Sequence, residues 1–231
     1  IYFVNLIAEY DGLYNHVGGA GNCDDVNGDP RAKALCTIHR QGIKDLDQFF
    51  NSGAYQRVSS RYAPHNVYTS VASLLDLQNK KGFTSSYVGF PRKTEQPSAT
   101  PTAKTIDFNI SSFLYNPHYD YDVATNSYKR SQAGKPHADE KSGAQISPKV
   151  VVAIVVQKGI ANDGVHSTYQ DIGTGKAYVF QDGTSLEGTW SKTDPKAQIT
   201  FTDSAGAAIA MNPGQTWISL VDQATDVSRE P

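Results

Sequence analysis

With 231 residues, the chain is long enough for one large domain or two small ones. Its formal net charge of -2 offers no basic face for phosphates, which argues against nucleic acid as a direct partner. The longest apolar run, 150–156, has the length of a strand, so no segment is expected to span a bilayer, and membrane attachment would need an anchor absent from this chain.

The first hundred residues predict short helices and a short strand. Apolar spacing and turn residues place helices at 1–9, 30–35, 43–50 and 67–81, and a strand at 13–17 that ends in Gly18-Gly19. The last helix is the clearest, because its apolar residues form one stripe and Gly82 ends it.

Beyond residue 100 the pattern changes to strands. Residues 91–104 are rich in Pro, Thr, Ser and Lys, which predicts an exposed loop or linker and a boundary near residue 100. Strands are expected at 105–114, 119–123, 127–130, 150–157, 175–181, 188–191, 198–202 and 216–221. The sequence therefore predicts an α+β fold, with an α/β portion at 1–100 and a mostly antiparallel, β-rich domain at 101–231.

The two cysteines bear on the compartment. Cys23 and Cys36 fit either a local disulfide or two unrelated buried thiols, and the polar segment between them favours the disulfide. A disulfide is typical of an extracytoplasmic protein. The chain has no initiator Met and opens on residues typical of a buried element, so we expect it to begin in mid-protein.

Several sequence blocks resemble the YerB-like family of bacterial lipoproteins. In chain order these blocks are Tyr10–Gly19 (YDGLYNHVGG), Arg61–Ser70 (RYAPHNVYTS), Tyr128–Asp139 (YKRSQAGKPHAD), Gln181-Asp182-Gly183, Gly188-Thr189-Trp190 and Asn212–Trp217 (NPGQTW). The second block is more specific than the first, and together the blocks cover nearly the whole chain.

The resemblance implies an N-terminal α/β portion and a separate β-rich C-terminal portion, usually behind a lipoprotein signal that tethers the protein outside the bacterial membrane. It implies no reaction, because none is established for the family. Family members carry a further N-terminal stretch, so we expect this chain to be a fragment that lacks its first strands. The insertion from Cys23 to Cys36 departs from the family pattern, and no family property is carried over to it.

The first candidate site is the glycine pair after the strand at 13–17. The exposed backbone amides around Gly18 and Gly19 favour an anion-binding nest, with His16 as a base or ligand beside it. The alternative is a histidine packed under a turn whose glycines need positive φ.

A second candidate comprises Arg61, His65 and Asn66, in the loop expected to enter the helix at 67–81. An anionic ligand there would meet the N-terminal helix dipole, a guanidinium and an imidazole. Alternatively, Asn66 caps the helix, and the other two side chains bind loop carbonyls and carboxylates.

A third candidate comprises Arg130, His137 and Asp139, in a polar loop after a strand. Asp139 either sets the tautomer of His137, as in a general-base pair, or joins it as a metal ligand; the alternative is a solvated turn. No Gly-x-Ser-x-Gly elbow is present, so a standard hydrolase triad is not supported.

Asp25, Asn27 and Asp29 place oxygen ligands at alternate positions, as the first half of a calcium loop does. Pro30 stands where that loop needs glycine, which excludes an EF-hand and leaves a looser calcium site or a polar surface turn. No other cofactor is predicted. The aromatic residues at 113–121 suit glycan or protein contact where exposed, and core packing where buried.

The first functional hypothesis is a non-catalytic envelope protein, membrane-anchored or secreted. It would bind a partner protein, a glycan or an anionic small molecule in a cleft between the two portions. One alternative is a His-dependent or metal-assisted hydrolase acting on a cell-wall or phosphate-bearing substrate. The other is a structural component of a surface assembly.

Overall fold

The computed structural model describes residues 2–21, 23–24, 33–162, 164 and 166–231. It divides the chain into two compact units. The first consists of Ile1–Gly89, Gly159–Thr168 and Asp194–Gln198, and the second of Phe90–Lys158, Tyr169–Thr193 and Ile199–Pro231. Short helices and several antiparallel sheets confirm the predicted α+β class. No helix in the described ranges combines the length and apolar character needed to cross a bilayer.

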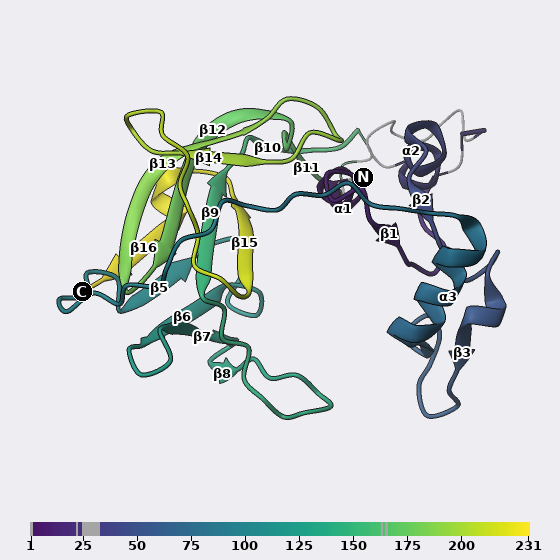
Figure 1. Ribbon diagram of the computed structural model, residues 1–231, viewed down its shortest axis with the longest axis horizontal. Helices are drawn as coiled ribbons and strands as arrows, with labels where there is room; N and C mark the ends of the chain where they lie inside the picture. Colours follow the sequence, from purple (N-terminus) through teal and green to yellow (C-terminus); the bar gives the residue numbers. More distant parts are fainter. Residues whose placement is uncertain (1, 22, 25–32, 163, 165) are drawn as a thin grey trace. The chain divides into compact units, whose positions relative to one another are not determined.

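The first unit is built from short elements (Figure 1). In chain order they are α1 (Tyr2–Ala8), β1 (Leu13–Tyr14), α2 (Ala34–Gln41), β2 (Lys44–Asp45), the 3-10 turn η2 (Ser52–Ala54), β3 (Tyr55–Arg57), β4 (Val67–Thr69) and α3 (Val71–Lys81). A further two-stranded sheet, formed by β10 (Lys158–Ile160) and β11 (Ser167–Tyr169), lies mostly in this unit. The helix predicted at 1–9 is confirmed as α1.

The structure corrects two predicted helices in this unit: one segment is not helical, and the other helix begins later than predicted. The segment 43–50 is not a helix, because α2 ends at Gly42, whose φ of 60° is left-handed, and the chain then forms β2 in parallel with β1. The helix expected from residue 67 begins at Val71, because 67–69 pairs as β4 with β3. The β-branched and aromatic residues of β4 favour a strand, and the Ser70 side chain caps α3 by accepting from Ser73 N at 3.1 Å.

The second unit contains two five-stranded sheets (Figure 1). One has the order β14-β13-β12-β9-β15 and the other β16-β5-β6-β7-β8. Their strands are β5 (Thr105–Phe108), β6 (Pro117–Asp122), β7 (Ser127–Gln132), β8 (Lys135–Pro136), β9 (Val150–Val155), β12 (Gly173–Gln181), β13 (Thr184–Lys192), β14 (Thr200–Thr202), β15 (Thr216–Val221) and β16 (Val227–Glu230). A 3-10 turn, η3 (Ala224–Asp226), precedes β16. All ladders in these sheets are antiparallel except that of β15 with β9.

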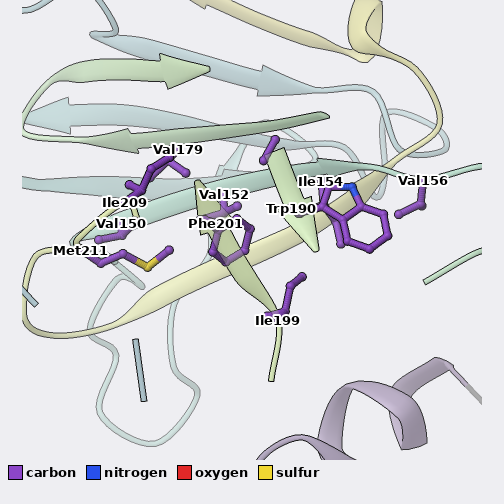
Figure 2. Close-up of a cluster of buried hydrophobic side chains, with 11 residues drawn as sticks. Val150, Val152, Ile154, Val156, Val179, Trp190, Ile199, Phe201, Ile209 and Met211 are labelled. Carbon is purple, nitrogen blue, oxygen red and sulfur yellow. The ribbon is translucent and has the colours of Figure 1, made fainter. Parts of the chain in front are cut away.

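The core of the second unit lies on both faces of β9. Alternate residues of a strand point to opposite faces, so Val152 and Ile154 join one apolar cluster, while Val151 and Ala153 join another that includes side chains of β5, β6 and β7. Figure 2 shows the first cluster, which includes Trp190 and Ile154. Burial on both faces explains why β9 is an unbroken apolar run.

A close approach between β12 and β13 positions the Trp190 indole in this core. The indole Nε1 donates a hydrogen bond of 2.9 Å to the backbone oxygen of Val155. Gly175, which pairs with Trp190 across the ladder, has no side chain in the way. A Cβ at Gly175 would lie 2.6 Å from Trp190 Nε1 and 2.7 Å from Val155 O, so only glycine fits there without a shift.

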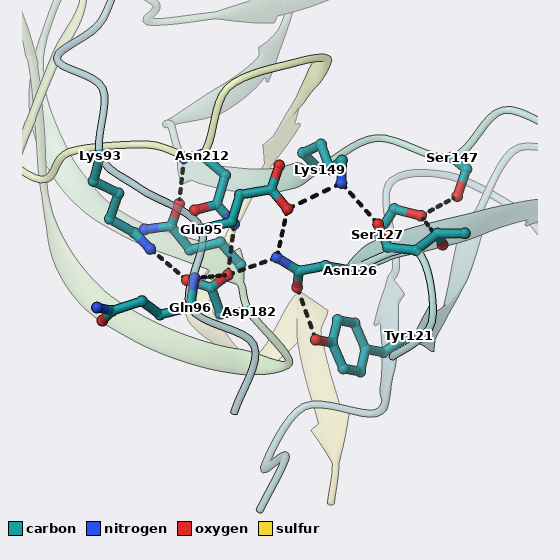
Figure 3. Close-up of polar contacts among 12 residues, drawn as sticks. Lys93, Glu95, Gln96, Tyr121, Asn126, Ser127, Ser147, Lys149, Asp182 and Asn212 are labelled. Carbon is teal, nitrogen blue, oxygen red and sulfur yellow. Dashed lines mark hydrogen bonds and ion pairs between the residues drawn. The ribbon is translucent and has the colours of Figure 1, made fainter. Parts of the chain in front are cut away.

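A buried polar cluster ties the extended segment 90–103 to the β6–β7, β12–β13 and β14–β15 connections of the second unit (Figure 3). Asp182, in the β12–β13 turn, accepts hydrogen bonds from Asn126 Nδ2 at 2.8 Å and Asn212 Nδ2 at 2.7 Å. The same carboxylate accepts from Lys93 Nζ and from the backbone amide of Gln96. Segment 91–104 is therefore a loop fixed by hydrogen bonds to the β-rich unit, and most of its residues are exposed, as its composition predicts.

Candidate functional site

The first unit has a cavity at the carboxyl ends of its two parallel strands. Parallel strands end at the same edge of their sheet, so the residues that follow each strand meet there, and ligands commonly bind at such an edge. His16 and Gly18 follow β1, while β2 ends at Asp45 and is followed by Asp47. The structure therefore brings together the predicted candidates His16 and Gly18 and two carboxylates.

His16 is held by two acceptors. Its Nδ1 lies 2.6 Å from the backbone oxygen of Gly18, and its Nε2 lies 2.8 Å from Asp45 Oδ1. The ring also stacks on Tyr14, with centroids 4.6 Å apart. Both ring nitrogens therefore face oxygen acceptors. Burial, and then the charge of Asp45, raises the pKa of Tyr14 above its ordinary value.

Asp47 fills the position where a nest would hold an anion. Its side chain is buried, and Oδ1 accepts from Gly18 N at 2.9 Å and from Phe49 N at 3.1 Å. The first amides of α2 are also engaged, since Leu35 N donates to Ala20 O at 3.2 Å. The glycine loop thus binds a carboxylate of the chain itself, which disfavours the anionic ligand expected there.

The glycines of this loop are needed for shape. Gly18 has a φ of 59°, and a Cβ there would lie 3.0 Å from the Phe49 ring. A Cβ at Gly19 would lie 3.0 Å from a methyl carbon of Leu35. Both glycines therefore allow the loop to pack closely against side chains that line the cavity.

The cavity has a volume of about 670 Å³, within the usual range of small-molecule sites. Its polar end carries Asp45 and Asp47, and no lysine or arginine lines it among the described residues. The remaining walls are mostly apolar and are formed by Gly18, Gly19, Leu35, Ile38, Gly42, Ile43, Phe49 and Phe50, with His39 at the side. Phe49 and Phe50 are largely exposed, so apolar surface is available at the rim.

The predicted disulfide is present beside this cavity. Cys23 and Cys36 are bonded, with their Cα atoms 4.7 Å apart, and Cys36 is a buried residue of α2. The calcium candidates Asp25, Asn27 and Asp29 lie outside the described residues. Within the described ranges, no group of three or more His, Cys, Asp or Glu side chains is arranged to hold a metal ion.

The second candidate does not lie at a helix entry. Arg61 and His65 are exposed residues of the connection between β3 and β4, which also contains a cis peptide bond before Pro64, and Asn66 ends that connection. Asn66 Oδ1 accepts from Arg57 at 2.9 Å instead of capping α3. The expected combination of helix dipole, guanidinium and imidazole is therefore wrong, because a strand stands between this connection and the helix.

The third candidate lies in the second unit, and the structure brings two of its residues together. Arg130 is buried, its guanidinium lies 4.3 Å from the centroid of the Trp217 ring, and it donates to His137 Nδ1. Burial, and then the charge of Arg130, lowers the pKa of His137. Asp139 accepts instead from Ser142 N and Oγ, both at 2.7 Å, so the predicted orientation of His137 by Asp139 is not seen. A site shared by both portions of the chain stays a prediction.

Sequence reasoning missed the two carboxylates of the cavity. Asp45 and Asp47 lie in the segment 43–50 that the apolar spacing predicts as a helix, and residues two apart in a helix point to different sides, so no shared site is indicated. One sequence signal could have indicated them. Gly42 is a typical helix C-cap, and the short segment after it contains Asp-x-Asp.

Comparisons with known proteins place the chain in context. Residues 1–84 match the N-terminal domain, and residues 106–218 the C-terminal domain, of a family described as "Protein of unknown function (DUF3048)". The fold is similar to the crystal structure of the YerB protein from Bacillus subtilis, with a TM-score of 0.80 and 20% sequence identity, covering 100% of this chain and 74% of that chain. No curated protein matches the sequence.

Proposed function

This chain belongs to the DUF3048 family of unknown function, as its resemblance to YerB-like proteins predicts, and we propose that it is an extracytoplasmic protein whose first unit binds an ammonium group carried by an apolar body. The observation that carries the proposal is the pair of carboxylates, Asp45 and Asp47, at the polar end of an otherwise apolar cavity.

The charge of the cavity favours a cation. Asp45 is paired with His16, whereas Asp47 has no ion-pair partner in the described part of the chain and is bound only by neutral backbone amides. A buried carboxylate without a cationic partner is stabilised by a ligand that supplies one. A primary ammonium carries three donors and no acceptor, which matches a polar end built from acceptors.

The residues that line the cavity favour a binding role over a catalytic one. Among the described lining residues there is no hydroxyl, thiol or lysine that could act as a nucleophile. Both nitrogens of the nearby His16 are engaged by Gly18 and Asp45, so its ring has a structural role. A binding role uses the features that are present: two carboxylates and apolar walls that bury the body of the ligand.

Alkylamine binding provides the test. Titration of the ¹⁵N-labelled protein with hexylamine is expected to shift amide resonances within residues 18–50. Asp45→Asn and Asp47→Asn keep an acceptor oxygen for the local hydrogen bonds but remove the charge, and each is expected to weaken binding about tenfold. Asp76→Asn, which removes an exposed carboxylate on α3 of the same unit, is the matched control and should leave the affinity unchanged.

Two further probes, one uncharged and one negatively charged, test whether the cavity selects the ammonium group. Hexanol shares the apolar body and hexanoate reverses the charge, so both should bind more weakly than hexylamine. The proposal is wrong if hexanoate binds as tightly as hexylamine, if the shifts fall outside the cavity, or if Asp76→Asn weakens binding as much as the two cavity variants do.

The extracytoplasmic location is supported by the Cys23–Cys36 disulfide, because such bonds persist in oxidising compartments and are rare in the cytosol. Proteinase K added to spheroplasts of cells that produce the protein is expected to degrade it while a cytosolic marker enzyme stays intact. Protection of the protein until the spheroplasts are lysed would place it in the cytosol instead.

A further inference from the structure

The outer face of one sheet in the second unit carries a row of polar side chains in register. Ser228 on β16 lies opposite Asp107 on β5, Asp107 lies opposite His118 on β6, and His118 lies opposite Ser131 on β7. Residues directly opposite one another point to the same face of the sheet. With strands about 4.8 Å apart, the row is about 14 Å long.

The row presents mainly oxygen atoms. His118 Nδ1 lies 2.8 Å from Asp107 Oδ1, and Nε2 lies 3.2 Å from Asp120 Oδ1, so both ring nitrogens face acceptors. Burial lowers the pKa of His118, but the hydrogen bonds and charges of the two carboxylates outweigh it, and the net pKa is raised. Ser131 Oγ and Ser228 Oγ make no hydrogen bond within the described residues and are available to a ligand.

A hollow of about 510 Å³ lies over this row. Its wall includes Phe113, whose side chain is 69% exposed and packs against Gly134. The loop that carries Phe113 is fixed by Asn116, whose Oδ1 accepts from Ile110 N and Ser111 N, both at 2.9 Å. The aromatic ring is therefore held beside the polar row by local hydrogen bonds.

We propose that this hollow binds an uncharged oligosaccharide. An aromatic face covers the C–H face of a sugar ring, while carboxylate, amide and hydroxyl groups bind its hydroxyls. Both kinds of group line the hollow, and the row crosses four strands, which is longer than one ring. Asp107 and Asp226 in the lining disfavour a phosphate or another anion. The site is independent of the cavity in the first unit.

Binding to a panel of neutral saccharides tests the proposal. We would titrate the ¹⁵N-labelled full chain with N,N′-diacetylchitobiose, maltotriose and cellotriose. At least one is expected to shift amide resonances in β5, β6 and the loop 109–116, with an affinity that added salt leaves unchanged because the ligand is neutral. Phe113→Ala is expected to weaken that binding about tenfold, as loss of an aromatic contact does.

A neighbouring aromatic residue gives the matched control. Tyr115 is 58% exposed on the same loop but does not line the hollow, so Tyr115→Ala should change the affinity less than twofold. Thermal unfolding of both variants checks that the loop substitutions leave the fold intact. The proposal is overturned if all three saccharides fail to bind at millimolar concentration, if the two variants weaken binding equally, or if added salt abolishes the binding.

Discussion

Replacing Asp182 with asparagine is expected to lower the free energy of unfolding of the second unit by about 3 kcal/mol at neutral pH. The Asp182 side chain is 9% exposed and accepts from Lys93, Gln96, Asn126 and Asn212. Asparagine has one acceptor oxygen and turns an NH₂ group toward these donors, so part of the set is left unpaired. It tolerates the φ of 57° at this position, which isolates the hydrogen-bond effect from backbone strain.

The effect of this substitution depends on pH. Burial raises the pKa of Asp182, but the hydrogen bonds from Lys93, Asn126 and Asn212 outweigh it, and the net pKa lies below its ordinary value. A carboxyl group with a lower pKa in the folded state stabilises the fold above about pH 4 and loses that contribution as the pH falls through the folded pKa. The difference between wild type and variant should therefore shrink on acidification.

Urea denaturation followed by far-UV circular dichroism, at neutral pH and near pH 3, measures both effects. Asp203→Asn is the matched control, because within the described residues the Asp203 side chain accepts only from Ala205 N and Ala207 N in a surface turn, and asparagine keeps the acceptor. Its effect should stay within about 0.5 kcal/mol. Equal stability of wild type and Asp182→Asn at neutral pH would show that the Asp182 carboxylate makes no net contribution to the free energy of unfolding.

Substituting Gly175 with alanine is expected to cost the second unit about 3 kcal/mol. The added methyl group would overlap Trp190 Nε1 and Val155 O, so either the strands separate or the indole moves. Overpacking of this kind costs about 1–3 kcal/mol, and loss of the buried indole hydrogen bond to Val155 adds about 1–3 kcal/mol. The two contributions overlap, because one movement of the indole relieves the first and causes the second.

Tryptophan fluorescence and chemical denaturation of Gly175→Ala measure these effects together. The emission of Trp190 should change even under conditions in which the variant is still folded, because the indole no longer donates its hydrogen bond to Val155 O. Gly53→Ala serves as the control, since a Cβ there meets no atom within 4 Å and its φ is not positive. A Gly175→Ala variant with wild-type stability and emission would contradict this close packing of Gly175 against Trp190 and Val155.

Local sequence pattern predicts the elements whose signal is strong. The apolar run at 150–156 predicts β9, and the helical face at 1–9 predicts α1. The failures arise where a tertiary partner decides the structure. Residues 43–50 have helical spacing, but pairing with β1 makes Lys44–Asp45 a strand. The helical stripe assigned from residue 67 includes three residues that pair with β3.

For the candidate sites too, local sequence predicts neighbouring residues but not partners that are distant in the sequence. The sequence predicts His16 and Gly18 as one site because they are neighbours, and it also predicts the Cys23–Cys36 bond. It does not reveal Asp45 as the partner of His16, because 29 residues separate them. Long-range pairing likewise forms the row from Asp107 to Ser131, since each side chain belongs to a different strand and no local pattern places them together.

The segment from Phe90 to Ala103 affects how the β-rich portion can be produced alone. A recombinant fragment limited to residues 106–218, the range of the family match, would remove Lys93 and Gln96 from the Asp182 carboxylate. It would also delete β16 and leave β5 as an open edge that other chains can pair with, which promotes aggregation. A fragment that starts at Phe90 and continues to Pro231 keeps both features and is the better choice for crystallisation or titration.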